Sequence, residues 1–150
     1  MTVPAVDRPT QPRPRPSARP GGDQALRWTA VAYVVAVLAH GADHLRRGID
    51  VVTTQVRSAG QVQLLLALLV LVLVLRGHRW APAASTALGF TSAALFVAVH
   101  FVPHWRSFSD AFTGGHVAPR VTGLSWLAAI VEVAAGLALG WVGARAMSRS

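Results

Sequence analysis

The sequence predicts an all-α fold, an integral membrane four-helix bundle with a disordered N-terminal tail. The chain of 150 residues is 53% hydrophobic and only 13% charged, whereas soluble domains carry about 25% charged residues. Its mean hydropathy is +0.45, and the apolar residues gather in four blocks. Each block is long enough to cross a hydrocarbon core of about 30 Å at 1.5 Å per residue.

The chain divides into a tail, one domain and a short end. Residues 1–25 hold six of the nine prolines and no apolar periodicity, so we expect a disordered, Arg- and Pro-rich cytoplasmic tail. The domain covers 26–145, with transmembrane helices at about 26–45, 58–75, 81–102 and 121–143, and a cytoplasmic tail follows at 146–150. The helices lack the polar face of period 3.6 that a soluble bundle needs. Signal-peptide cleavage before His40 is the alternative for the first helix.

Small residues distinguish three of the four helices. They lie at helical spacing from a polar residue: Ala32 and Ala36 before His40, Gly89 and Ala93 before His100, Gly136 and Gly140 after Glu132. Membrane helices pack closely along such stripes, so we expect these polar side chains inside the bundle. The second helix, "LLLALLVLVLVL", has no stripe and is expected at the outside, with Gln61 and Gln63 in reach of the site.

All 14 basic residues are Arg, and they lie in tails and loops. Their distribution favours both termini in the cytoplasm and a multi-pass protein of the cell membrane. The arginines form no single patch with interleaved aromatic residues, so no nucleic-acid partner is expected; the expected partner is the lipid bilayer. The absence of Cys excludes disulfides and thiolate ligands.

Five of the six histidines are expected at the outer face. His40 and His44 end the first helix, His100 and His104 end the third, and His116 lies in the following loop. Because residues i and i+4 share a helix face, two such pairs could supply four nitrogens to one metal ion. Asp43 would be a further ligand or the acceptor that fixes a histidine tautomer. Pro103 can end the third helix early, which would place His104 on a loop.

Glu132 is an intramembrane acid near the middle of the fourth helix. A charge at that depth costs at least ~2.5 kcal/mol, so such residues are functional by default. It would be a metal ligand, a proton carrier or the partner of an Arg or His; the alternative is a protonated Glu hydrogen-bonded between helices. The helical rise places it roughly 16 Å from the outer end and His40 roughly 7 Å deep, so Glu132 is expected below the histidines.

Nitrogen and carboxylate ligands suit Zn, Cu, Ni or Fe. Haem b is the alternative cofactor, with one axial His from the first helix and one from the third. Nearby aromatic residues would then line the porphyrin, or they form an ordinary interfacial belt: Phe96, Phe101, Trp105, Phe108 and Trp126. A third alternative has no cofactor, with the imidazoles hydrogen-bonded to one another, to Asp43 and to lipid headgroups.

The short element "GADH", Gly41 to His44, is similar to the Gly-x-Asp-His element of nickel permeases and of urease and hydrogenase accessory membrane proteins. The similarity covers four residues, and the longer His-containing motifs of those proteins are absent from this chain. It assigns no family.

The leading hypothesis is a small polytopic membrane protein with a histidine-rich metal or haem site near the outer face, serving metal handling or transport. The alternatives are a membrane metalloenzyme or redox subunit, and an accessory or structural subunit without metal. Transport by so short a chain predicts a homo-oligomer, for which Gly136 and Gly140 offer a contact. No nucleophile triad, phosphate loop or nucleotide-binding motif occurs, so whether the protein is an enzyme stays open.

Overall fold

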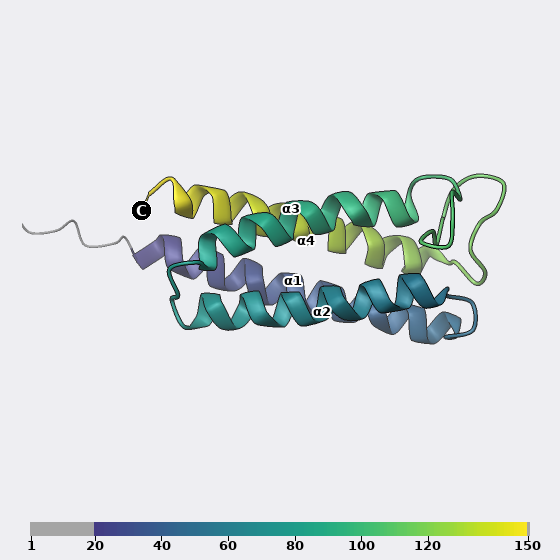
Figure 1. The fold of residues 1–150 in the computed structure, drawn as a ribbon, viewed down its shortest axis with the longest axis horizontal. Coiled ribbons are helices and arrows are strands. Elements are labelled where there is room, and N and C mark those ends of the chain that lie inside the picture. The colour runs from purple at the N-terminus through teal and green to yellow at the C-terminus, as the bar shows by residue number, and fades with distance from the viewer. Residues whose placement is uncertain (1–19, 150) are drawn as a thin grey trace, which may run out of the picture.

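A computed structural model describes residues 20–149, and these residues form four helices and no strand (Figure 1). The helices are α1 (Pro20–Arg47), α2 (Thr54–Leu75), α3 (Ala81–His100) and α4 (Gly123–Met147). Each is long and apolar enough to cross a membrane. The predicted class of an all-α bundle of four membrane-length helices is thus confirmed. Of the predicted tail, 1–25, residues 1–19 lie outside those described and residues 20–25 belong to α1.

The helix ends follow local capping rather than hydropathy. The side chain of Thr53 accepts a hydrogen bond from the Val56 backbone N–H at 3.2 Å, so α2 begins at Thr54, four residues earlier than the apolar block. Thr122 and Ser125 form a reciprocal capping box at the start of α4. α3 ends at His100, before Pro103, so His104 lies on the loop.

The helices form a ring in which each packs against its neighbours in sequence and α1 closes against α4. The first residues of α1 and the end of α4 lie at one end of the bundle (Figure 1). At the other end, which we call the loop end, lie the segments 48–53 and 101–122. α2 is the least buried helix and exposes Leu65 and Leu69, as expected for a helix that faces lipid.

Glycines bring α3 and α4 into backbone contact. Gly89 lies against the backbones of Gly136 and Gly140, and a Cβ at Gly89 would lie only 2.8 Å from the Gly140 Cα. Gly136 and Gly140 are buried in this contact. A homo-oligomer contact through these two glycines would therefore compete with α3, and self-association of the chain stays a prediction.

Gly89→Ala is expected to lower the free energy of unfolding by about 1–3 kcal/mol, because the added methyl group forces the α3 and α4 backbones apart. Chemical unfolding in detergent micelles measures the change. Gly60→Ala is the matched control: a Cβ there meets nothing within 4 Å, and Ala favours the helix by about 1 kcal/mol over Gly. Equal stability of the two variants would contradict the close packing inferred at Gly89.

Candidate metal centre

Three of the predicted histidines converge at the loop end of the bundle. His40 and His44 lie one turn apart on α1, and His100 is the last residue of α3. One ring nitrogen from each lies within 4.8 Å of those of the other two. His40 and His100 are buried and His44 is half-buried. We call these three residues the histidine group.

The ring nitrogens of the histidine group are placed for shared binding. Nε2 of His40 and Nε2 of His44 are 2.7 Å apart, a hydrogen bond in which one ring donates and the other accepts, so a metal ion would have to replace the shared proton. The Nδ1 atoms of both rings are buried and have no hydrogen-bond partner among residues 20–149. Nδ1 of His100 lies 3.0 Å from the backbone oxygen of Asp110. If Nδ1 donates this bond, the Nε2 lone pair of His100 is free to bind a metal ion.

A buried ion pair between Arg47 and Asp110 lies next to the histidine group. Arg47 is fully buried and binds Asp110 in a bidentate manner, with N–O distances of 2.6 and 2.7 Å. The Asp110 carboxylate is also 3.5 Å from Nδ1 of His100 and 3.9 Å from Nδ1 of His44. A carboxylate behind the outer nitrogen of a histidine is the usual support of a metal ligand, because it orients the ring and raises its basicity.

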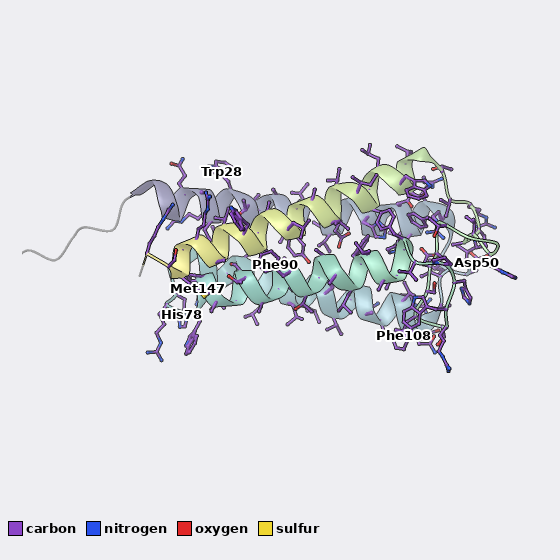
Figure 2. All side chains as sticks on the ribbon, turned by 90° about the horizontal axis from the view of Figure 1, so that it is seen from above. Trp28, Asp50, His78, Phe90, Phe108 and Met147 are labelled. Carbon is purple, nitrogen blue, oxygen red and sulfur yellow. The ribbon has the colours of Figure 1, made fainter. Side chains whose placement is uncertain are left out.

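The segment 101–122 folds over the histidine group. Its Phe112 N–H donates to the His100 carbonyl at 2.8 Å, and the Asp110 N–H donates to the Val99 carbonyl at 3.1 Å. Near the other end of the segment, Nε of Arg47 donates a hydrogen bond to the Pro119 carbonyl at 3.1 Å. Side chains crowd this end, where Asp50 and Phe108 are labelled in Figure 2. The segment therefore covers His100 at the loop end, while His44 stays half-buried.

The other predicted ligands, Asp43, His104 and His116, are not among the residues whose ligand atoms converge. His104 and His116 are exposed on the segment 101–122, with ring centroids 6.4 Å apart. Asp43 is buried but pairs with Arg46 at 2.8 Å, and in the described part of the chain its second oxygen has no hydrogen-bond partner. The roles of these three residues as metal ligands stay predictions.

Glu132 belongs to a second polar group deeper in the bundle. Its Oε1 accepts a hydrogen bond from the side chain of Gln63, which also reaches Tyr33 and Ser92. Ser92 lies two turns before His100 on α3, with Phe96 between them in contact with the His40 and His100 rings. This agrees with the expected depth of Glu132 below the histidines.

The geometry favours a metal ion over haem. A porphyrin would have to lie between His100 and either His40 or His44 as axial ligands, but the ring centroids of these two pairs are only 4.8 and 5.8 Å apart. The aromatic side chains do not line a free slot there: Phe101 and Trp126 pack on Phe112, and Trp105 and Phe108 are exposed. The three convergent ring nitrogens are better placed to bind a single metal ion than to hold a haem between them.

The sequence reasoning missed Arg47 and Asp110 as residues of the site. Arg47 carries a detectable signal, because it follows His40 by seven and His44 by three and so shares their helix face. Asp110 carries none, since it lies in an irregular segment whose path depends on tertiary contacts.

Fold and site together define a class: a protein of four membrane-length helices with a buried histidine group that could hold a metal ion. No protein-family model matches the chain, and no curated protein or solved structure matches it.

Proposed function

We propose that the chain is a membrane protein of metal handling that binds one transition-metal ion through His40, His44 and His100, near the outer face. The observation that carries this proposal is the convergence of three ring nitrogens in a buried site backed by Asp110. Zn, Cu, Ni and Fe suit such nitrogen ligands. Around Zn at bonds of about 2.0–2.1 Å, tetrahedral ligand atoms lie roughly 3.3 Å apart, so small ring rotations would close the site.

The covering segment favours metal handling over enzyme chemistry at the ion. An enzyme that acts on an organic substrate needs an open coordination position that the substrate can reach. Here the segment 101–122 lies over His100, with the ring centroids of Phe112 and His100 4.8 Å apart. A bare ion needs a far smaller opening than an organic substrate. If the ion passes through the membrane, so short a chain would act as a homo-oligomer, with both termini in the cytoplasm.

The test is metal analysis of detergent-purified protein after loading with Zn, Cu, Ni or Fe(II). The wild type is expected to hold one ion per chain, and His40→Ala/His100→Ala is expected to hold none. His104→Ala/His116→Ala is the matched control, since it removes two exposed histidines outside the group, and it should retain the ion. A wild type that stays empty after loading contradicts the proposal.

A structural role without metal is the second candidate, and the Arg47–Asp110 pair favours it. The pair joins α1 to the segment 101–122 in a buried polar core, with His44 and His100 beside the same carboxylate. Such a core can order the loop end without an ion. An accessory subunit of a larger membrane complex would then bind no metal in the loading experiment while remaining folded.

A further inference from the structure

The second polar group takes one side chain from each of the four helices. Tyr33 comes from α1, Gln63 from α2, Ser92 from α3 and Glu132 from α4. Tyr33, Ser92 and Glu132 are buried. The Gln63 amide nitrogen lies 3.1 Å from the Tyr33 hydroxyl and 2.8 Å from the Ser92 hydroxyl, and it also contacts Oε1 of Glu132. We call these four residues the central polar group.

An ionised Glu132 would have too few hydrogen-bond donors for its two carboxylate oxygens. Within residues 20–149, its Oε2 is buried and has no hydrogen-bond partner, and no ion pair joins Glu132 to a cation. A buried carboxylate that receives a single neutral hydrogen bond is strongly disfavoured in a membrane interior. Protonation of Glu132 removes this charge.

The amide of Gln63 can serve both states of Glu132. It carries two N–H donors, but three oxygen atoms surround its nitrogen. The Tyr33 and Ser92 hydroxyls are also hydrogen-bonded to each other, so one of them donates its proton to the other. When the amide is turned over, its oxygen can accept from the remaining hydroxyl proton and from a protonated Glu132. The two orientations exchange only N and O of the amide, so each protonation state has its own hydrogen-bond arrangement.

We propose that Glu132 is a reversible proton-binding site at the centre of the bundle, with Gln63 turning over as the proton binds. The proton is favoured over a sodium ion because the Gln63 amide occupies the point where the three oxygens converge. The groups that face the carboxyl are Tyr33, Gln63 and Ser92, and the nearest histidines along the bundle lie beyond Phe96. The proposal does not depend on metal binding.

The sequence allows a direct test, because Glu132 is the single glutamate of the chain. Cell-free synthesis with glutamate ¹³C-labelled at the side-chain carboxyl gives one NMR signal in lipid nanodiscs, recorded with a chelator from about pH 4 to about pH 10, a range that brackets ordinary and strongly shifted carboxyls. One protonation step is expected, with the same midpoint in sodium chloride and in choline chloride. Gln63→Leu and Ser92→Ala are each expected to move that midpoint by about one pH unit or more.

Gln61→Leu is the matched control, because Gln61 lies two residues before Gln63 on α2 but is exposed. It should leave the midpoint unchanged. A signal that keeps one chemical shift over the whole range overturns the proposal, as does a midpoint that falls as sodium replaces choline, which would assign the site to sodium. Equal shifts in Gln61→Leu and Gln63→Leu would overturn the role of the central polar group.

Discussion

Arg47→Met is expected to lower the free energy of unfolding by about 3–5 kcal/mol, because it leaves the Asp110 carboxylate buried without its cation. Arg47 is fully buried and gives Asp110 two hydrogen bonds of 2.6 and 2.7 Å. Met fills much of the space of the Arg stem, so the loss reports the charge rather than a cavity. Denaturant unfolding in detergent micelles with a chelator present measures it without any contribution from bound metal.

Two further variants separate the charge effect from general damage. Adding Asp110→Asn to Arg47→Met should recover part of the lost stability, because the uncompensated charge is gone. Arg57→Met is the control at an exposed position of α2, where a change within about 0.5 kcal/mol is expected. If Arg47→Met costs no more than Arg57→Met, the ion pair does not hold the loop end together.

The Arg47–Asp110 pair also connects the fold to the site. Asp110 reaches the histidines only because the segment 101–122 folds back on α3 and binds Arg47. The same carboxylate then lies beside the outer nitrogens of His44 and His100. A loss of the pair would therefore disturb the support of two ring nitrogens as well as the stability of the loop end.

The helices and the histidine group were predictable because they depend on local rules. Hydropathy over 20 residues or so predicts a membrane-length helix, and the i, i+4 spacing predicted that His40 and His44 share a face. The small-residue stripe that ends in His100 placed that residue inside the bundle, where it is buried. Helix ends were harder: the cap at Thr53 lies outside the second apolar block, and the cap at Thr122 lies within the fourth block, where hydropathy does not mark it.

The remaining parts of the site depend on contacts between distant segments. The segment 101–122 has no periodicity, so nothing in the sequence predicted that Asp110 would turn inward while His104 and His116 stay exposed. α2 was expected at the outside, with Gln61 and Gln63 as equal candidates to reach the histidines. The structure places Gln63 against Glu132 and leaves Gln61 exposed, because a two-residue step on a helix turns the side chain to a different face.

Metal loading is expected to stabilise the folded protein by about 4 kcal/mol when the free metal exceeds its Kd by about 1,000-fold. The three ligands meet only in the folded ring of helices, in which α1 packs on α2 and α4, and α3 packs on the same two. The ion would therefore bind the folded state and not the unfolded one. An ion held by His40, His44 and His100 would join the helices that face each other across the ring, α1 and α3. Denaturant unfolding at controlled free metal, before and after chelation, measures the gain and its reversal.

The same experiment on variants locates the ion. The stabilisation should vanish in His40→Ala/His100→Ala, which removes one ligand from each of the two helices, and persist in His104→Ala/His116→Ala, which changes exposed side chains of the segment 101–122. Stabilisation that survives in the first variant and disappears in the second would place the ion on the exposed histidines. Metal handling would then take place at the surface of the loop end, and the buried histidine group would keep only its structural role beside Arg47 and Asp110.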